Sequence, residues 1–175
     1  GQELEIFDKA TIWRKYIYSI TNRYFKDNFL EIGAGIGSFT LNYCKNFQNI
    51  MLTDLDENNI KILKEKFFKN RNIKIESKKI NEMKNKFDTI IYLNVLEHIE
   101  DDTNEINLAI NKLNLGGHLI ILVPAHQKLF GKFDSAVGHY RRYNIDFFKL
   151  NKFENTKIEK IIYLDLFGYI LYFFN

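Results

Sequence analysis

The chain has 175 residues, of which 46% are hydrophobic and 27% charged, and these proportions exclude an intrinsically disordered or fibrous protein. The 25 basic and 22 acidic residues leave a formal net charge of +3, which does not by itself indicate a nucleic-acid-binding surface. The single cysteine, Cys44, has no intrachain disulfide partner and fits a reducing compartment. At about 150 residues per domain, we expect one domain covering residues 1–175.

The N-terminal segment predicts an amphipathic helix rather than a targeting signal. Its residues lack the charged and then apolar plan of a secretory signal, so we expect a cytoplasmic protein. Between about residues 7 and 26, aromatic and aliphatic side chains recur at helical spacing, with Lys and Arg between them. Such an aromatic stripe is typical of core packing rather than of a cofactor site.

The middle of the chain alternates between predicted strands and predicted helices. Segments 38–47, 57–69 and 103–113 carry apolar residues at three- and four-residue spacing, as crossover helices of parallel β-α-β units do. Strands buried on both faces form continuous apolar runs. Five such runs predict strands: FLEIGA (29–34), IMLTDL (50–55), NIKIES (72–77), FDTIIYLN (87–94) and GHLIILVP (117–124). The predicted fold class is α/β, with a doubly wound, mostly parallel sheet.

A glycine-rich turn follows the first predicted strand in LEIGAGIGSFT, from Leu30 to Thr40. Gly33, Gly35 and Gly37 would let the backbone approach a ligand without Cβ clashes, and a helix start offers free N–H groups. In a dinucleotide site these amides would bind a pyrophosphate. The spacing is G-x-G-x-G rather than G-x-G-x-x-G, however, and Glu31 would repel a pyrophosphate. The alternative is a glycine loop of another nucleotide-binding α/β domain.

Two acids suggest a different ligand. Glu31 suits a cationic ligand with an amino group and a sulfonium, which points to S-adenosylmethionine. Asp54 ends the second predicted strand, about twenty residues after the glycine turn, where a carboxylate can bind two ribose hydroxyls. The strand, the glycine turn and Asp54 are therefore all consistent with a site for S-adenosylmethionine.

These motifs resemble those of the class I S-adenosylmethionine-dependent methyltransferases, in the broad set of types 11 and 12. EIGAGIG is similar to the E/D-x-G-x-G-x-G motif, and TDLDENNI to the acid motif of the second strand. FDTIIYLNVLEHIEDD is similar to the fourth-strand motif with its Leu-Glu-His triplet, here Leu96, Glu97 and His98. LNLGGHLIILVPAHQKLFGKFDSAVGHYRRY resembles the fifth strand and following loop of a subset. The match covers most of the chain.

The resemblance implies a Rossmann-like methyltransferase fold with S-adenosyl-L-methionine as the cofactor. The glycines would surround its methionine part, Asp54 would bind the ribose, and Leu55 would flank the adenine. Asn94 would face the methionine part or the acceptor. The implied cofactor-binding residues are Glu31, Gly33, Gly35, Gly37, Asp54, Leu55 and Asn94.

The chain departs from the family pattern in two places. Many relatives bind the adenine amino group with an acid after the third strand, where this chain has Lys78 and Lys79. At the C-terminus, residues 157–167 can supply a sixth strand, but none remain for a seventh, so we expect a truncated or minimal version. Asp165 and Gly168 interrupt the apolar end, which is shorter than the roughly 20 residues of a transmembrane helix. Three interpretations stay open: a sixth strand with a docked helix, the stump of a longer chain, or a surface that contacts a partner or a membrane.

The polar stretch 124–143 follows the fifth predicted strand, at the edge where open α/β sheets bind ligands. A hydroxyl or ammonium acceptor needs a base, and imidazole, with an unperturbed pKa of about 6.5, is suited to that role. Guanidinium groups can bind a carboxylate or phosphate. Alternatively, the arginines cap helices and pair with Asp134 or Asp146. The candidate catalytic residues are His126 and His139, and the candidate substrate-binding residues are Arg141, Arg142 and Tyr143.

Other patterns narrow the function. Enzymes that methylate amino groups of DNA or of protein glutamine usually have an (N/D)PPY motif, where this chain has LNVLE. Cytosine C5 methylation needs a cysteine beside the fourth-strand site, but Cys44 occupies an apolar helix position instead. We therefore expect no nucleic-acid substrate. We also predict no metal. The sequence thus favours methyl transfer to a small-molecule, sugar or lipid-linked acceptor, with peripheral membrane contact through the apolar C-terminus. The alternatives are a non-catalytic cofactor- or partner-binding domain and a dinucleotide-dependent oxidoreductase, whose pyrophosphate loop the chain lacks.

Overall fold

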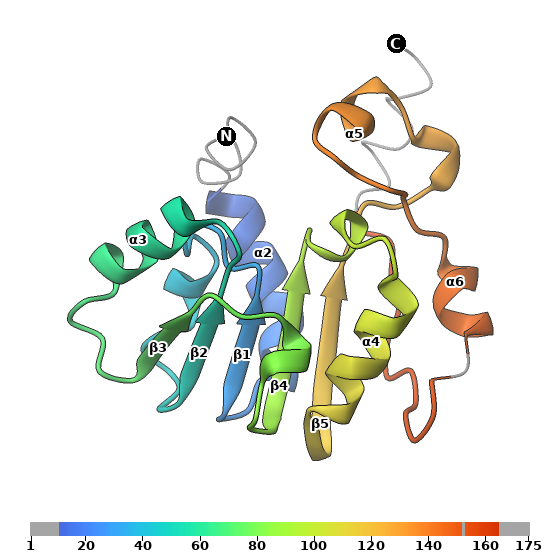
Figure 1. The fold of residues 1–175 in the computed structure, drawn as a ribbon. Helices are drawn as coiled ribbons and strands as arrows, with labels where there is room; N and C mark the ends of the chain where they lie inside the picture. The colour runs from blue at the N-terminus through green and yellow to red at the C-terminus, as the bar shows by residue number, and fades with distance from the viewer. Residues whose placement is uncertain (1–10, 152, 165–175) are drawn as a thin grey trace. The chain divides into compact units, whose positions relative to one another are not determined.

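The computed structural model describes residues 11–151 and 153–164. The chain forms two compact units, Gly1–Val123 and Pro124–Asn175, which are distinguished in the ribbon drawing by their colours (Figure 1). The sheet and the glycine turn belong to the first unit, and both candidate catalytic histidines belong to the second. The single domain expected from the sequence stays a prediction.

A five-stranded parallel sheet with the order β3-β2-β1-β4-β5 forms the centre of the first unit. The chain runs from β1 outward to β3, then returns to β4 on the other side of β1. The order therefore reverses between β1 and β4, which makes the sheet doubly wound and confirms the predicted fold class. All five predicted strands are confirmed: β1 (Phe29–Ile32), β2 (Ile50–Thr53), β3 (Ile73–Glu76), β4 (Phe87–Leu93) and β5 (Leu113–Leu122).

The strand register brings the predicted ligand-binding segments to one edge of the sheet. Ile32, the last residue of β1, pairs with Thr53 of β2 and with Tyr92 of β4. The residues that follow these three strands therefore emerge at the same level. In doubly wound sheets, ligands bind at this edge, where the strand order reverses.

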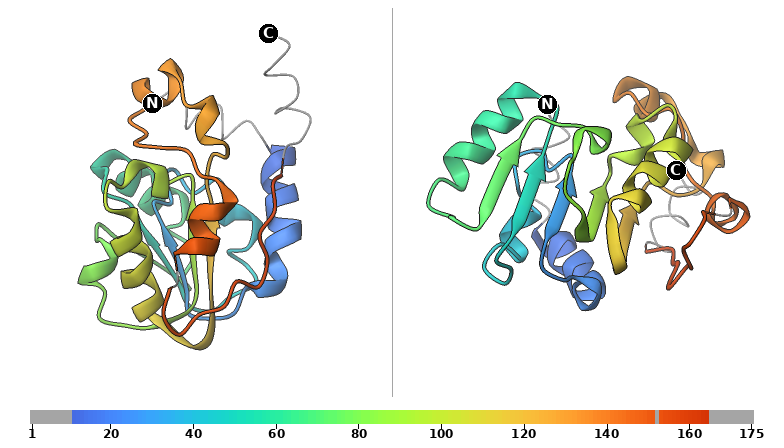
Figure 2. Two further views of the ribbon diagram at one scale, coloured as in Figure 1. Left: turned by 90° about the vertical axis from the view of Figure 1, so that its right-hand side faces the viewer. Right: turned by 60° about the horizontal axis from the view of Figure 1, so that its bottom comes forward.

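Three helices of the first unit agree with the predicted segments. Helices α2 (Thr11–Thr21) and α4 (Asp102–Asn111) lie on opposite faces of the sheet (Figures 1 and 2). The helix predicted over 7–26 is confirmed for α2, which tightens into the 3-10 turn η1 (Asn22–Tyr24), while residues 7–10 lie outside the described residues. Helix α3 (Glu57–Lys66) confirms the helix predicted over 57–69, and α4 confirms that over 103–113.

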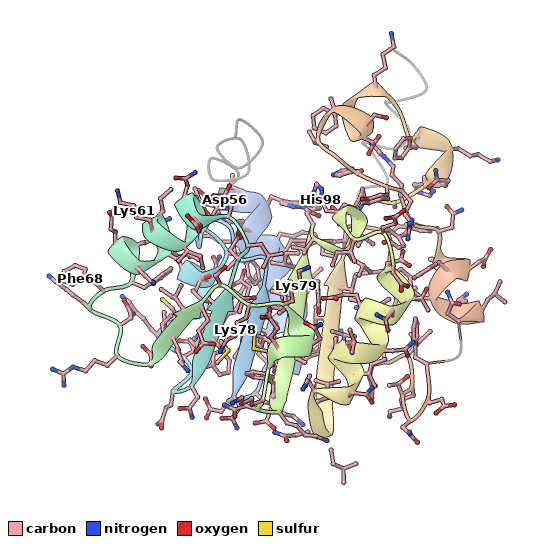
Figure 3. All side chains as sticks on the ribbon, viewed as in Figure 1. Asp56, Lys61, Phe68, Lys78, Lys79 and His98 are labelled. Carbon is pink, nitrogen blue, oxygen red and sulfur yellow. The ribbon has the colours of Figure 1, made fainter. Side chains whose placement is uncertain are left out.

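Carboxylates determine where α3 and α4 begin. The side chain of Asp56 accepts a 2.7 Å hydrogen bond from the Asn58 amide, and Figure 3 shows Asp56 at the start of α3. Asp101 caps α4 in the same way, accepting from the Asn104 amide at 3.3 Å. An N-cap acceptor of this kind satisfies one of the amides that a helix leaves free at its start.

The helix predicted over 38–47 is wrong. This segment forms the 3-10 turn η2 (Thr40–Asn42) and then irregular turns, held by three-residue hydrogen bonds such as Tyr43 N to Thr40 O (3.1 Å). Its aromatic, β-branched and asparagine residues are poor helix formers. The apolar spacing instead serves packing, because the ring of Tyr43 lies 4.5 Å from that of Phe29 and 5.7 Å from that of Phe39.

The second unit has less regular structure. It contains the 3-10 turn η5 (Gln127–Leu129) and the short helices α5 (Lys132–Ala136) and α6 (Ile145–Leu150), and a parallel bridge joins Ala125 to Tyr143. The predicted sixth strand is wrong for residues 157–164, which form no helix or strand. Most of these side chains are exposed, and a strand needs a neighbour to pair its backbone groups. The rest of that prediction, with the three C-terminal interpretations, falls on residues 165–175, outside the described residues.

Within residues 11–151 and 153–164, no helix is long and apolar enough to cross a membrane.

The packing of the central strands predicts a large stability effect. Leu30 in β1 is fully buried, whereas Leu115 in β5 is fully exposed. We expect Leu30→Ala to lower the free energy of unfolding by about 2–5 kcal/mol, because it leaves a cavity among the central strands. Leu115→Ala is the matched control, and its expected effect is below about 0.5 kcal/mol. Urea denaturation measures both, and equal effects would contradict this account of the core.

Candidate functional site

The glycine turn after β1 has a backbone that only glycine adopts readily. Gly33, Gly35 and Gly37 have φ values of +64°, +56° and +74°. A Cβ atom on Gly33 would lie 2.5 Å from Cγ2 of Val95, and one on Gly37 would lie 2.5 Å from Cε2 of Phe67. The first and third glycines therefore allow close packing inside the protein, against the segment after β4 and against the end of α3.

Asp54 connects the glycine turn to the end of β2. Its Oδ2 accepts a 2.8 Å hydrogen bond from the Gly35 amide, and its Oδ1 accepts from the Asp56 amide at 2.9 Å and from Nδ2 of Asn59 at 3.2 Å. The half-buried carboxylate is thus held in one orientation at the edge where the strand order reverses. Sequence reasoning missed the role of Asn59, because this side chain meets Asp54 only after α3 has begun.

Glu31, predicted to contact the cofactor, is buried in β1 and is 3% exposed. Among the described residues, the hydroxyl of Thr40 donates to its Oε2 at 2.7 Å, and the hydroxyl of Tyr43 donates to the same atom. Burial is the main reason why the pKa of Glu31 rises to about 7; the charge of Asp54 adds to the rise, and the two hydroxyl bonds oppose it. The carboxylate therefore anchors the 38–47 segment to the sheet. Its contact with a cofactor stays a prediction.

Leu55 and Asn94 lie at the same edge. Leu55, next to Asp54, is 59% exposed, so its apolar side chain is available to a flat apolar ligand. Asn94 follows β4 with a φ of +53°, a conformation that asparagine tolerates better than most residues, and its amide donates to Leu122 O at 2.9 Å. The structure thus brings the end of β4 and the glycine turn to one edge, and the predicted ligand contacts of both residues stay predictions.

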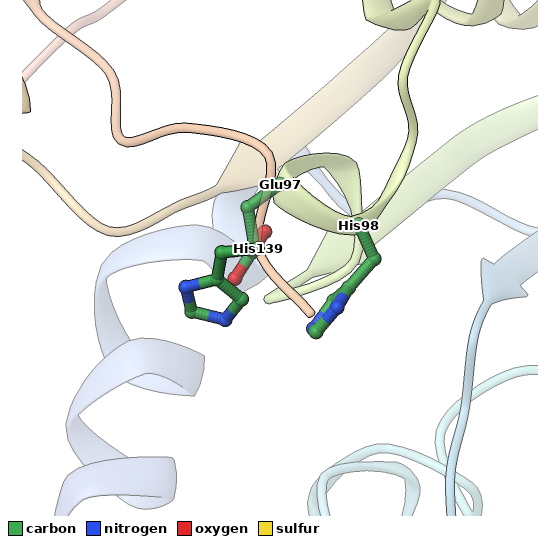
Figure 4. Close-up of side chains that lie close together, drawn as sticks. All are labelled: Glu97, His98 and His139. Atoms are coloured by element: carbon green, nitrogen blue, oxygen red, sulfur yellow. The ribbon is translucent and has the colours of Figure 1, made fainter. Parts of the chain in front are cut away.

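The Leu-Glu-His triplet forms the 3-10 turn η4 (Leu96–His98) after β4. Leu96 is fully buried, and Figure 4 shows the side chains of Glu97 and His98 leaving this turn. Figure 3 shows His98 at the edge of the sheet where β4 ends. The triplet therefore shapes the segment that also carries Val95, the side chain that packs against Gly33.

The third strand does end with an acid, Glu76, but two lysines form ion pairs with it. Glu76 pairs with Lys74 at 2.5 Å and with Lys78 at 2.6 Å, and the hydrogen bonds from these lysines lower its pKa. Lys78 and Lys79 lie on the segment that follows β3 (Figure 3). The segment in which many relatives have an adenine-binding acid thus contains, in this chain, the ion pairs of Glu76 with two lysines.

In the second unit, Asp134 connects two of the predicted residues. Its Oδ1 lies 2.9 Å from Nδ1 of His139 and accepts from Nε of Arg142 at 2.8 Å, while its Oδ2 accepts from the Gly131 amide at 2.9 Å. Burial alone would raise the pKa of Asp134, but the hydrogen bonds from Arg142, Gly131 and His139 lower it to about 2. The alternative in which an arginine pairs with Asp134 is thus confirmed for Arg142. A substrate contact of Arg142 stays a prediction.

The other candidates in this unit contact aromatic neighbours. His126 has a φ of +64°, and its ring stacks on Tyr163 with the centroids 4.5 Å apart. Its amide also donates to Tyr143 O at 2.9 Å. The guanidinium of Arg141 lies 5.9 Å from the ring centre of Tyr140.

Tyr143 is 3% exposed, and its ring lies 5.1 Å from that of Phe147 and 5.7 Å from that of Phe148. These contacts give the tyrosine a packing role in the second unit. The predicted catalytic role of His126 and the substrate contacts of Arg141 and Tyr143 stay predictions.

A family model described as a methyltransferase domain matches residues 12–159. No curated protein matches the sequence. Among solved structures, the chain is similar to a S-adenosylmethionine-dependent methyltransferase from Clostridium acetobutylicum, with 23% identity, a TM-score of 0.57, and coverage of 70% of this chain and 57% of that one.

Two further structures have the same fold. The N-methyltransferase NodS from Bradyrhizobium japonicum, in complex with S-adenosyl-l-homocysteine, has 20% identity, a TM-score of 0.62, and coverage of 77% of this chain and 68% of that one. CalS10, a SAM-bound amino pentose methyltransferase from Micromonospora echinaspora, has 11% identity, a TM-score of 0.58, and coverage of 69% and 54%. The chain thus spans little more than half of the Clostridium and Micromonospora proteins.

The buried Glu31 predicts a pH-dependent stability. Because folding raises its pKa from 4.5 to about 7, the folded state keeps a proton that the unfolded state releases between these values. The stabilising contribution is complete below the lower value and is lost as the pH rises through about 7. Glu31→Gln keeps an oxygen that can accept both hydroxyl bonds but cannot ionise. We expect the variant to match the wild type near about pH 4 and to be more stable by about 3 kcal/mol at about pH 8.

Urea unfolding of both proteins across this pH range measures the difference. Glu57→Gln, at an exposed acid in the first turn of α3, is the control and should give a flat difference. A pH-independent difference for Glu31→Gln would show that burial does not perturb this carboxyl.

Proposed function

The chain belongs to the methyltransferase domain family, and from this premise we propose that it transfers a methyl group from S-adenosyl-L-methionine to a small-molecule, sugar or lipid-linked acceptor. The resemblance to class I S-adenosylmethionine-dependent methyltransferases is thereby confirmed at the level of the family, and the doubly wound parallel sheet agrees with it. We also propose a cytoplasmic location, as the sequence suggested.

The observation that carries this proposal is the Asp54 contact with the glycine turn. A carboxylate fixed by the Gly35 amide lies at the end of β2, where it can accept hydrogen bonds from ribose hydroxyls. Protein donors already take three of its roughly four acceptor positions. The ribose would therefore use the remaining position and share or replace the longest bond, that from Asn59.

The remaining residues fit the rest of the cofactor. The glycine turn would present backbone to the methionine part, the exposed Leu55 would flank the adenine, and Asn94, just after β4, would face the methionine part or the acceptor. Bound S-adenosylmethionine supplies the methyl group on a sulfonium, which leaves as a neutral thioether. The protein would then contribute mainly alignment of the acceptor in a water-poor site.

The names of two structural neighbours suggest which acceptors to test first. NodS is an N-methyltransferase and CalS10 is an amino pentose methyltransferase, so an amine or a sugar is the first acceptor to test. A second candidate function is a non-catalytic cofactor- or partner-binding domain, which is favoured by the lack of a sixth strand within residues 157–164.

Calorimetric titration with S-adenosylmethionine, S-adenosylhomocysteine and NADH tests the cofactor. We expect the first two to bind with micromolar Kd, equivalent to about 8 kcal/mol, and NADH to give no signal. Binding of NADH alone would indicate an oxidoreductase instead. Silence from all three ligands in a folded protein would contradict the proposal.

Asp54→Ala should abolish the binding of S-adenosylhomocysteine. Two hydrogen bonds to a charged group are together worth about 3 kcal/mol or more, and the variant also frees the glycine turn. Asp56→Ala is the matched control, because it removes the neighbouring carboxylate that caps α3. We expect that control to be slightly less stable but to bind. Unchanged binding by Asp54→Ala would remove Asp54 from the ribose site.

His139→Ala should slow methyl transfer while cofactor binding survives. A general base contributes about 100-fold or more to turnover, whereas the glycine turn and Asp54 belong to the other unit. Transfer of labelled methyl groups to a panel of amines and amino sugars measures turnover, and calorimetry measures binding. A variant with normal turnover would exclude His139 from the reaction.

A further inference from the structure

The segment 61–79, which contains the second half of α3, a turn and β3, is strongly basic. It has eight Lys or Arg residues and two acids, so its formal charge is twice the +3 of the whole chain. One of the acids, Glu76, pairs with two of the lysines. Among the described residues, no carboxylate forms an ion pair with Lys61, Lys69 or Arg71. The small net charge of the chain therefore coexists with a local excess of positive charge.

An exposed aromatic side chain lies in the same segment. Phe67 is buried at the end of α3, whereas the next residue, Phe68, is 76% exposed. Figure 3 shows Phe68 at the outer end of the turn between α3 and β3, directed away from the sheet. Nζ of Lys69 lies 5.3 Å from the centre of its ring. The turn therefore presents an apolar ring and a positive charge side by side.

Hydrogen bonds fix this turn to the segment that precedes β2. The Asn70 amide donates to Phe67 O at 2.8 Å within the turn. Nδ2 of Asn72 donates to Cys44 O and to Phe47 O, both at 2.7 Å. The exposed ring is thus carried by a backbone of defined conformation.

A hollow with a volume of about 520 Å³ lies where these two segments meet. Three exposed basic residues, Lys45, Lys69 and Arg71, line it. Its other lining residues are three amides, a cysteine and a phenylalanine, so the lining contains no acid. A lining of this kind favours an anionic group, and the planar guanidinium fork matches a phosphate. Because Lys69 also contacts Phe68, the hollow and the exposed ring form one continuous surface.

Two kinds of polyanion match the charge, and the single exposed ring favours one of them. Nucleic-acid surfaces combine positive charge with several aromatic rings on which successive bases stack. The segment 61–79 contains only two aromatic residues, Phe67 and Phe68, and the first is buried. An anionic bilayer attracts clusters of about four to eight basic residues, and one aromatic ring can enter its headgroup region. The combination therefore fits a membrane better than a nucleic acid.

We propose that this surface, composed of Lys45, Phe68, Lys69 and Arg71, binds the chain to an anionic phospholipid membrane. Phe68 enters the headgroup region, and the basic side chains contact the lipid phosphates. The inference goes beyond the proposed function and does not depend on it. The turn precedes the first residue of β3, whereas the candidate cofactor site follows the last residues of β1 and β2, so the two lie at opposite ends of parallel strands. Membrane binding would thus leave the cofactor edge accessible.

Co-sedimentation with vesicles tests the proposal directly. The vesicles contain phosphatidylcholine with about 30% phosphatidylserine, or phosphatidylcholine alone. We expect the chain to bind the anionic vesicles but not the neutral ones, and to be released when the salt concentration rises from about 0.1 M to about 0.5 M. Absence of binding to the anionic vesicles, or equal binding to both kinds, would overturn the proposal.

Substitution of the exposed ring tests its insertion. We expect Phe68→Ala to weaken binding to the anionic vesicles by about tenfold, because it removes most of the apolar area that enters the membrane. Leu115→Ala, at a fully exposed apolar residue of β5, is the matched control and should change binding by less than about twofold. Circular dichroism verifies that both variants are folded. Equal effects of the two substitutions would show that the ring does not enter the membrane and would overturn the proposal.

Neutralisation of the basic residues tests the charge contacts. Each basic residue near an anionic surface contributes about fivefold to binding, so we expect Lys69→Gln and Arg71→Gln each to weaken it by about that factor. Lys132→Gln removes the same charge from an exposed position of α5 in the other unit and should have an effect below about twofold. Similar losses in all three variants would indicate a general charge effect and overturn the proposed surface.

Fluorescence anisotropy with a single-stranded RNA of about 20 nucleotides tests the competing partner. We expect the anionic vesicles to bind the chain and the RNA to bind no more tightly than it binds Phe68→Ala. RNA binding that requires Phe68, in a protein that does not bind anionic vesicles, would identify a nucleic-acid surface and overturn the membrane proposal.

Discussion

The hydrogen bond from the Gly35 amide to Asp54 is the constraint on which the candidate cofactor site depends. It joins the turn after β1 to the end of β2, so one carboxylate fixes both a backbone and a side-chain position. The turn requires glycine at positions 33 and 37, because a Cβ atom there would collide with the side chains of Val95 and Phe67. Strand register then brings the segment after β4 to the same edge.

Each unit contains a buried carboxylate that holds neighbouring segments together, but the surroundings shift the pKa values of the two carboxylates in opposite directions. Glu31 receives two neutral hydroxyls, which do not offset its burial, so its pKa rises to about 7. Asp134 receives a guanidinium, an imidazole and a backbone amide, so its pKa falls to about 2 despite burial. Burial penalises the charged form in both cases, and the number and charge of the donors decide the result. The first acid is thus suited to anchoring a segment, and the second to holding a cationic partner.

Errors in the predicted elements have a common physical origin. The 38–47 segment has apolar residues at helical spacing, yet it folds into a 3-10 turn because Tyr43 bonds to Glu31 and packs on Phe29. Residues 157–164 have the apolar composition of a strand but form none. In both cases periodicity describes which side chains can be buried, whereas the conformation depends on the partners that the backbone and side chains find.

The five strands, the parallel doubly wound class, the helices α3 and α4, and the glycine turn with Asp54 could all be predicted from the amino-acid sequence. These features depend on local patterns, namely apolar runs, helical periodicity and glycine spacing, which act over a few residues. The folded structure was needed to show that Asn59 donates to Asp54, that Thr40 and Tyr43 both donate to Glu31, and that Asp134 contacts both His139 and Arg142. Each of these contacts requires a turn or a helix end to bring separated side chains together, and the geometry of that approach exists only in the folded chain.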